Sequence, residues 1–446
     1  MSASWRRRAP LLLGAAVCEA AYLALAALGD LGQHLLLTWA AFYTAFAAYA
    51  LLGWWVLRRP GGSPAAILAA ALLFRLTLLT SPPTLSDDLY RYLWDGRVQW
   101  AGINPFRHPP EAPELAPLRD RWYPGINHKD VPTIYPPAAQ LFFLAATGVA
   151  AHPVSVKAGL VLCEAALAAA LWGLLRRRGL DPRRLLLYAW NPLAVGGGAG
   201  RGHRDPLALA LLFASLYWLA AGARRAAAAA LGGAVLAKLV PLLAVPVLWR
   251  DLGRGGTAAP AAARRDLRWA AVVIAAGYGL YAAAGAGLFG GLRAYALRWR
   301  ANDSLYGAVE AALRLAGPAA VAPYRARWAC AALLLLAGAW ILWRLRDPVQ
   351  AVFALVGTYL LLTPTLHPWY VLWALPFLPL FPSPAWTLLS GLVFLAYAVL
   401  GGYRSTGVWQ EPAWVRWAEY GPFYLVLART WWRRRGRPEQ PPLSGV

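Results

Sequence analysis

Stretches of about 20 apolar residues recur along the chain and limit what it can fold into, because a helix of that length crosses a bilayer. The first three stretches are Ala9–Gly29, Leu35–Leu57 and Ala65–Thr80. Hydrophobic residues make up 59% of the sequence and charged residues only 14%. This composition is typical of a polytopic membrane protein. The sequence therefore predicts an all-α fold, a bundle of membrane helices.

Arginine clusters lie between the apolar stretches and dominate the net charge of +23. In a soluble protein such a charge would suggest nucleic acid, but basic clusters at the ends of membrane helices follow the positive-inside rule. We therefore expect membrane lipids, and no nucleic acid, as partners of these clusters, and both termini in the cytoplasm. The clusters are Arg6–Arg8, Arg58–Arg59, Arg176–Arg184, Arg224–Arg225, Arg250–Arg268, Arg344–Arg346 and Arg433–Arg437.

Alternation of the two membrane sides predicts about 12 crossings. They form a single domain over residues 1–432, followed by a disordered cytoplasmic tail at 433–446. Ala138–Ala150 is expected to enter the membrane only partly, because a full crossing would place the Arg176 cluster outside. Residues 81–135 then form the first large outer loop, which is expected to be helical in part. The remaining predicted crossings are Val154–Leu175, Leu185–Gly198, Pro206–Ala220, the hairpin Ala226–Trp249, Trp269–Phe289, Trp328–Trp343, Val349–Thr363, Trp369–Phe381, Trp386–Leu400 and Tyr420–Trp431.

Two adjacent carboxylates, Asp87 and Asp88, open a short predicted helix in this outer loop, and Ser86 can cap it. Charges beside a membrane are costly to hold unless they face water or serve chemistry. Two interpretations are open. In the first, both acids are helix-start residues paired with Arg91 or Arg97. In the second, one of them is a general base at the outer mouth of a membrane-embedded pocket.

The same helix has a polar and an apolar side. Helical spacing places Asp88, Tyr92 and Asp95 on one face. The apolar side is able to lie on a bilayer interface. Its residues are Leu89, Leu93, Trp94 and Trp100.

Further polar side chains fall at the predicted outer ends of the spans. Each has a structural explanation: histidine beside proline is commonly a turn residue, aromatic residues form the interfacial belt, and Lys238 can snorkel to the nearer surface. Arg75, inside the third span, can neutralise Glu19 or Glu164. Taken together, acid, imidazole and cations on one side of a bundle are what an anionic lipid-linked substrate needs. The residues at the span ends are His203, Asp205, Lys238, Asn302, His367 and Tyr370.

Metal chemistry has little support in the sequence. His203 and Asp205 are a weak candidate pair of ligands, because no H-E-x-x-H motif or cysteine-based site is present. No cofactor and no metal site are expected, and the need for a divalent cation is left open.

Several of these motifs resemble a known family in their order and spacing. They are Asp88–Tyr92, Gly102–Phe106, Tyr135–Pro137, Gly202–Asp205 and His367–Tyr370. Together they resemble the GT-C superfamily of membrane glycosyltransferases, and within it the bacterial polyprenol-phosphate-mannose-dependent mannosyltransferases of glycosyltransferase family 87 and its relatives. The resemblance extends from about Leu72 to Tyr424. Arg204 departs from the pattern, which has an apolar residue at that position.

The resemblance implies a cavity open to the outer leaflet of a bacterial cytoplasmic membrane. There, a hexose, expected to be mannose, passes from a polyprenyl-phosphate donor to a glycolipid or polysaccharide acceptor with inversion at C1. Asp88 is implied as the base, since the family pattern places a tyrosine four residues later, at Tyr92, and Asp87 as a second acid. The implied contacts of the donor phosphate are His367 and, as further candidates, Arg91, Lys238, Arg75 and His203. The implied acceptor or pocket residues are Tyr92, Asp95, Tyr135, Asn302 and Tyr370.

Two other functions are compatible with a membrane bundle. A flippase or transporter of lipid-linked sugar would favour ionisable residues at mid-bilayer and an inverted repeat, which the sequence does not show. A related enzyme acting on protein or lipid A would be expected to carry a large soluble outer domain, and none is visible.

Overall fold

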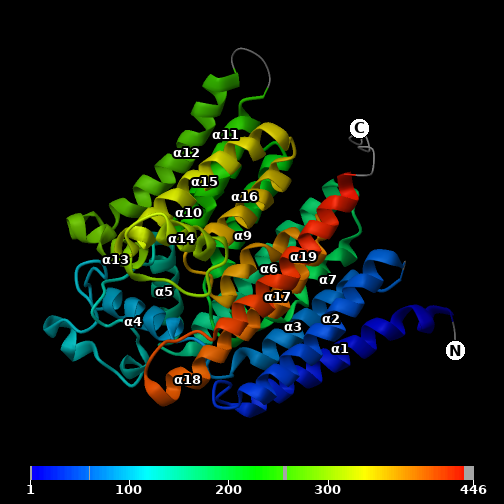
Figure 1. Cartoon of the computed structure of the whole chain (residues 1–446), viewed down its shortest axis with the longest axis horizontal. Coiled ribbons are helices and arrows are strands. Elements are labelled where there is room, and N and C mark those ends of the chain that lie inside the picture. The colour runs from blue at the N-terminus through cyan, green and yellow to red at the C-terminus, as the bar shows by residue number, and fades with distance from the viewer. Residues whose placement is uncertain (1–2, 60, 255–258, 436–446) are drawn as a thin grey trace.

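The computed structural model describes residues 3–59, 61–254 and 259–435, which form helices joined by loops (Figure 1). No strand occurs among these residues, and one isolated parallel bridge joins Ala301 to Thr365. The predicted all-α class is confirmed. Residues 433–435 of the predicted tail continue the last helix, and 436–446 lie outside the described residues.

The α-helices are α1 (Ala3–Leu28), α2 (Leu35–Arg58), α3 (Pro64–Leu79), α4 (Asp88–Trp100), α5 (Pro137–Val149), α6 (Pro153–Arg177), α7 (Leu186–Ala189), α8 (Pro192–Val195), α9 (Asp205–Ala220), α10 (Arg224–Ala237), α11 (Val245–Leu252), α12 (Ala259–Gly279), α13 (Gly290–Arg298), α14 (Leu305–Leu315), α15 (Ala322–Arg344), α16 (Pro348–Leu362), α17 (Pro384–Leu392), α18 (Val399–Thr406) and α19 (Ala413–Arg435). The short 3₁₀ elements are η1 (Pro113–Leu118), η2 (Tyr123–Gly125), η3 (Pro182–Leu185), η5 (Val240–Ala244), η6 (Ala282–Phe289), η7 (Ala319–Val321), η8 (Pro368–Trp373), η9 (Leu375–Phe377) and η10 (Val393–Ala398), and η4 (Gly196–Gly200) is a π-helix.

Five helices of the described chain are long and apolar enough to cross a membrane. They are Ala9–Leu28, Leu35–Arg58, Pro153–Arg177, Ala319–Arg344 and Pro384–Thr406. A pair bent by 102°, Ala261–Gly279 with Ala282–Arg298, gives a sixth if it forms one span. Shorter apolar helices, α3, α5, α9 and α16, accompany them. The structure supports a multi-pass membrane protein and does not confirm the count of about 12 crossings. The 13 residues of α5 are too few for a full crossing, in keeping with the partial element expected there.

Three predicted spans are wrong as continuous helices. Trp269–Phe289 crosses the 102° bend between α12 and η6. The other two are Leu185–Gly198, which is divided into η3, α7, α8 and η4, and Trp369–Phe381, which consists of η8 and η9. The breaks in these two follow the residue types, because Pro192 and Pro376 interrupt helical hydrogen bonding and the glycines from Gly196 lower helix propensity. Both segments are buried in the protein, where irregular backbone can exist at membrane depth.

The helices pack into two main cores. α1, α2 and α3 enclose Tyr22, Phe74 and Trp190, while α9 packs against both α6 and α10 in the larger core. Figure 1 shows α4, α13 and α18 at one end of the molecule and the C-terminal end of α19 at the other. The predicted hairpin of residues 226–249 is present, since α10 ends at Ala237 and the chain turns through η5 into α11.

The apolar side of helix α4, which the sequence showed to be able to lie on a bilayer interface, is largely buried against the protein. Leu89, Leu93 and Trp94 are at most 4% exposed. Leu89 and Leu93 pack with residues of α5 and α6, and Trp94 packs with the loop that follows α4. Only Trp100 of this side is exposed, at 62%. This packing holds the first turn of α4, and hence both acids, in a defined place.

Candidate active site

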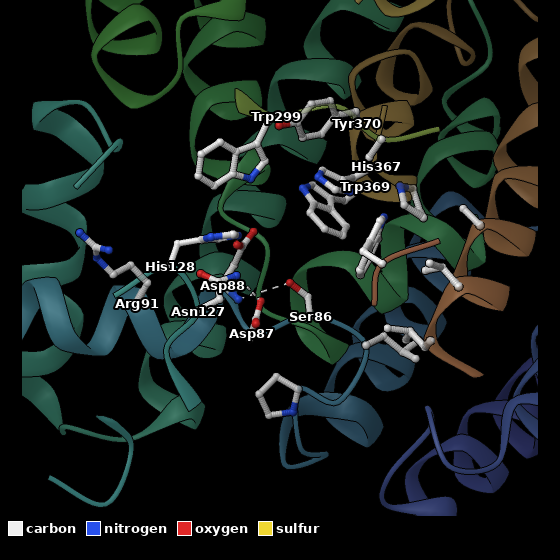
Figure 2. Close-up of a pocket in the computed structure, with 18 of the residues that line it drawn as sticks. Ser86, Asp87, Asp88, Arg91, Asn127, His128, Trp299, His367, Trp369 and Tyr370 are labelled. Carbon is white, nitrogen blue, oxygen red and sulfur yellow. Dashed lines mark hydrogen bonds between the residues drawn. The ribbon is translucent and has the colours of Figure 1, made fainter. Parts of the chain in front are cut away.

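A cavity of about 900 Å³ lies between α4, the loop that follows it and the C-terminal third of the chain. Its walls come from the first turn of α4, the loop around Asn127, the start of α9, the end of α10, the loops near Asn302 and His367, and the segment around Tyr403. Figure 2 shows how these distant segments meet around Asp87 and Asp88. The acids, cations and imidazoles that the sequence places on separate loops therefore share one space.

The acid pair is not held by the arginines that follow it. Asp87 is the N-cap residue of α4 and Asp88 its first residue, and both line the cavity. Arg91 is bound instead to Asp95, 2.9 Å away, and its guanidinium points away from the acid pair in Figure 2. The structure thus contradicts the interpretation in which the acids pair with Arg91 or Arg97, since Arg97 lies 3.1 Å from Asp120.

Asp87 is held by an amide and forms no ion pair with a cation of the described chain, although the charge of Lys129 acts on it. The Nδ2 of Asn127 donates a hydrogen bond of 2.6 Å to Oδ1 of Asp87. Burial and the adjacent Asp88 carboxylate raise the pKa of Asp87 to about 7, against the hydrogen bonds that stabilise its ionised form. Asp87 thus exchanges its proton near neutral pH.

Asp88 lies on the basic side of the pair. Its Oδ2 is 3.7 Å from Nδ1 of His203, and Oγ of Ser86 accepts a 3.4 Å hydrogen bond from its backbone N–H. Burial raises the pKa of Asp88, but His203, His367 and Arg204 outweigh burial and hold that pKa below its ordinary value. Asp88 is therefore ionised at neutral pH and able to accept a proton.

An indole ring links the two histidines of the site. The ring of Trp369 stacks on His203 at 4.0 Å and on His367 at 4.5 Å between centroids. His203 is fully buried behind the cavity, and neither of its ring nitrogens has a hydrogen-bond partner among the described residues. Burial lowers the pKa of His367, which lines the cavity, to about 4. His367 is therefore a neutral hydrogen-bonding group rather than a cation at pH 7.

Lys238 and Asp205 form an ion pair of 2.5 Å on the cavity wall. The ammonium group lies 4.4 Å from the ring centre of Tyr370, and Nε1 of Trp373 donates a 2.5 Å hydrogen bond to Asp205. Asp205 is thus engaged by a lysine and an indole, which removes it from the metal-ligand pair with His203. No group of three His, Cys, Asp or Glu side chains that could hold a metal ion occurs in the described parts of the chain.

Three of the residues expected at the site do not line the cavity: His203, which is buried behind it, and the charged residues Arg75 and Asp95. Arg75 is 5% exposed and forms a 2.6 Å ion pair with Glu164, which confirms the structural explanation for this arginine. Asp95 is 1% exposed and accepts hydrogen bonds from Arg91 and Thr133. Both were placed at the site because of their charge, whereas their hydrogen-bond partners hold them in the protein interior.

The remaining pocket residues line the cavity in different ways. Tyr92 stacks on Phe143 with 4.5 Å between ring centres, and Tyr135 meets Tyr92 edge-on. Asn302 has a left-handed backbone with φ of 46°, and its Nδ2 donates a 2.7 Å hydrogen bond to Glu419. Tyr370 shares a hydroxyl hydrogen bond with Tyr295.

Sequence reasoning missed several cavity residues. Asn127 lies in a long polar loop with no helical periodicity, so nothing in the sequence joins it to Asp87. Trp369 lies at the start of an apolar stretch, where an interfacial tryptophan is expected, but its ring stacks between two histidines. Arg204 was noted only as a departure from a pattern, and it lines the cavity beside Asp205. For Arg204, the signal was an arginine placed between His203 and Asp205.

The all-helical bundle with its long apolar helices and polar cavity fits a membrane protein that binds a polar ligand. A family model described as "alpha-(1→6)-mannopyranosyltransferase, N-terminal domain", the MptA_B family, matches residues 8–250. The match covers more than half of the chain's 446 residues, and the chain belongs to this family, which confirms the predicted GT-C relationship. The protein is thus a membrane mannosyltransferase. No curated protein and no solved structure matches it.

The matched region contains one side of the cavity and not the other. Asp87, Asp88, His203 and Lys238 fall inside residues 8–250. The loop of His367, which supplies the stacked tryptophan, falls outside them. The cavity itself is what joins the two parts of the chain.

Proposed function

We propose that the enzyme transfers mannose from a polyprenyl-phosphate donor to a hydroxyl of a glycolipid or polysaccharide acceptor, with inversion at C1. The supporting observation is that an acid pair shares one cavity with a basic wall that includes Lys238 and Arg204. Such a cavity suits a neutral nucleophile that must lose a proton and a leaving group that carries negative charge.

The chemistry needs only one proton transfer. The acceptor oxygen attacks C1 of mannose while its proton passes to the carboxylate of Asp88. The bond between C1 and the phosphate oxygen breaks, and its electron pair stays with the phosphate. No acid is needed for this leaving group, because the departing phosphate is stable as an anion and the basic wall stabilises its charge. Asp87 lies next to the base and orients the acceptor.

The family description also suggests the linkage. It names an α-(1→6) bond, and a single displacement that forms an α product starts from a β-linked donor. We therefore propose a β-linked mannosyl phosphate as the donor and a primary hydroxyl of a mannose-containing acceptor as the nucleophile.

The proposed reaction takes place at the outer leaflet of a bacterial cytoplasmic membrane, within one transmembrane domain over residues 1–432. The cavity lies at the end of the molecule that carries α4 and α18, away from the end of α19 (Figure 1). An exposed acid of the outer loop, Glu114, allows a test of this orientation. A Glu114→Cys variant should react with a membrane-impermeant thiol reagent in intact cells, and labelling only after lysis would place the loop in the cytoplasm.

The donor assignment is tested with purified protein in lipid vesicles that contain labelled polyprenyl-phosphate mannose and acceptor. We expect transfer from this donor, and Asp88→Asn should reduce it about 10²- to 10⁴-fold, the usual contribution of a general base. Glu114→Gln, which neutralises an acid of the same loop, is the control and should retain activity. Use of a nucleotide-linked mannose alone would contradict the proposal. Movement of labelled donor across the membrane without a glycosidic product would favour the flippase alternative.

A further inference from the structure

The cations that line the cavity differ in whether their charge is already neutralised. A cation that is paired with a carboxylate offers less attraction to an incoming phosphate than an unpaired one, because the carboxylate repels the ligand. The lysine and arginine side chains that line the cavity are Arg91, Arg204, Lys238, Arg298, Arg300 and Arg404.

Five of these cations are held in ion pairs with carboxylates. The pairs are Arg91–Asp95 at 2.9 Å, Lys238–Asp205 at 2.5 Å, Arg298–Asp130 at 3.2 Å, Arg300–Asp303 at 2.5 Å and Arg404–Asp30 at 2.8 Å. The imidazole of His367, expected to contact the phosphate, adds no charge because burial lowers its pKa to about 4. Most of the basic wall is therefore electrostatically balanced before any ligand arrives.

Arg204 is the exception among the described cavity residues. Its side chain is buried at 8% exposure, and it forms no ion pair with any described carboxylate. Its guanidinium lies 4.5 Å from the ring centre of Tyr135, and its Nη1 donates a 2.5 Å hydrogen bond to the carbonyl of Ala237. Since a guanidinium carries five N–H groups, several donors are left for a ligand.

An unpaired buried charge is costly, and an arginine is always protonated in proteins. A site of this kind becomes electrostatically complete when an anion binds. The planar donor geometry of arginine matches the oxygens of a phosphate group, which can accept two parallel hydrogen bonds. The position of Arg204, beside the ion pair of Asp205 and near Asp88, places this charge next to the reacting groups.

We propose that Arg204 is the residue that binds the phosphate group of the lipid-linked donor and stays bound to the phosphate after the sugar has left. This inference rests on the proposed function. The donor phosphate is a diester with one negative charge, and cleavage of its bond to the sugar leaves a monoester that can carry two. The interaction with Arg204 therefore strengthens as the reaction proceeds, which is the condition for stabilising a transition state.

The inference gives Arg204 the role that the resemblance assigned to other cations. An apolar residue at position 204 could not make this contact, whereas Lys238, one of the further candidates from the sequence, is neutralised by Asp205. Among the described residues, Arg204 supplies an unpaired positive charge, whereas the other five cations of the cavity are already paired with carboxylates.

The experiment compares the binding of a short-chain polyprenyl phosphate with that of the uncharged polyprenol of the same length. Charge-assisted hydrogen bonds contribute about 1.5–3 kcal/mol, so Arg204→Gln should weaken binding of the phosphate about 10- to 100-fold and leave binding of the alcohol unchanged. The KM for the donor should rise while the KM for the acceptor stays within about twofold. Arg121→Gln, which removes an exposed cation of the outer loop that does not line the cavity, is the control and should retain the affinity of the wild-type protein for the phosphate.

Equal phosphate affinity in the wild-type protein and in Arg204→Gln would overturn the inference and leave the proposed function standing. Failure of the wild-type protein both to bind polyprenyl phosphate and to use the donor would overturn both. Where Arg204→Gln does not fold, Arg204→Lys decides the question, because it retains a charge and a donor for the Ala237 carbonyl. Lysine should weaken phosphate binding several-fold, since it cannot form the bidentate contact, and unchanged affinity would count against the inference.

Discussion

Two buried ion pairs of this protein have similar distances and burial but lie in different surroundings. Arg75 pairs with Glu164 at 2.6 Å, and Lys238 pairs with Asp205 at 2.5 Å. The acid is at most 3% exposed in both pairs. Each pair joins residues far apart in the sequence, and both cations were candidates for the same role at the donor phosphate.

Their surroundings separate them. Nη1 of Arg75 also donates hydrogen bonds to the backbone carbonyls of Ala71 and Ala189, both at 2.9 Å, so the guanidinium is held by partners inside the protein. Lys238 lies on the cavity wall against the ring of Tyr370. A structural ion pair and an ion pair at a binding site can have similar residue types and similar distances. The two kinds differ in whether the pair faces a space that a ligand can enter.

The largest effect is expected for the pair in the interior. Arg75→Met leaves Glu164 buried without its partner, and breaking a buried pair in this way costs about 3–5 kcal/mol of stability. Transfer per folded molecule should stay near the wild-type value, because Arg75 does not line the cavity. Thermal unfolding in detergent, combined with transfer assays on the folded fraction, measures both quantities.

The double replacement Arg75→Met with Glu164→Leu is the control for this variant. Replacing both charges by apolar groups should recover most of the lost stability, because no charge is left buried alone. A well-folded Arg75→Met variant that has lost transfer activity would break the comparison and return Arg75 to the site.

Much of the helical fold could be predicted because it depends on local composition. Long apolar stretches identified α1, α2, α6 and α15, and the proline and lysine near position 238 marked the turn after α10. The segments containing Pro192 and Pro376 were predicted wrongly, because an apolar stretch buried by the rest of the protein has the same composition as a membrane span. Only the three-dimensional packing tells them apart.

The residue types at the site could be predicted from the sequence, but the partner of each charged side chain could not. Adjacent carboxylates in a loop beside a membrane are unusual enough to indicate the acid pair from sequence alone. The partners of several of these groups come from distant parts of the sequence, as the contacts of Asp88 with His203, Arg75 with Glu164 and Asp87 with Asn127 show. For this reason Arg75 and Asp95 were placed at the site by type, while Arg204 and Asn127 were not.

The next largest effect is expected at Gly202, in the turn that leads to Asp205. Its backbone φ is 76°, and a Cβ added there would lie 2.2 Å from Cδ1 of Leu89 on α4. Gly202→Ala should therefore lose about 2–4 kcal/mol of stability, from the left-handed backbone and from overpacking. The same change should reduce transfer, because it displaces α4 and the turn from each other.

Gly222 is a matched control for this prediction. Its φ is 78°, but no atom lies within 4 Å of an added Cβ. Gly222→Ala should lose only about 1 kcal/mol, the cost of the backbone conformation, and should keep its activity. Equal losses in the two variants, measured by thermal unfolding and transfer, would show that the contact between the turn and α4 has no special importance.

Lys238→Met tests the cavity-facing pair directly. Asp205 keeps its hydrogen bond from Trp373, so we expect a smaller stability loss than for Arg75→Met, about 1–3 kcal/mol. Transfer by the folded protein should fall about 10- to 100-fold, because Asp205 is left as an uncompensated negative charge beside the phosphate. We expect the Arg75 variant to lose mainly stability and the Lys238 variant to lose mainly transfer activity. Losses of stability and activity in equal proportion in both variants would contradict the distinction between the two ion pairs.

The smallest effect is expected at Asp87, an acid that forms no ion pair with any described cation, unlike Glu164 and Asp205. Its pKa of about 7 lies above the ordinary value of 3.8, so folding takes up a proton between these values and stability falls as pH rises from 4 to 7. Ionised Asp87 adds negative charge beside Asp88 and makes it a stronger base, so transfer should rise a few-fold as pH passes 7. Asp87→Asn should remove this step from the pH profiles of both stability and rate, whereas Arg75→Met should preserve it. A step near pH 7 that persists in Asp87→Asn would assign the titration to another group and leave Asp87 as an ionised acid like the other two.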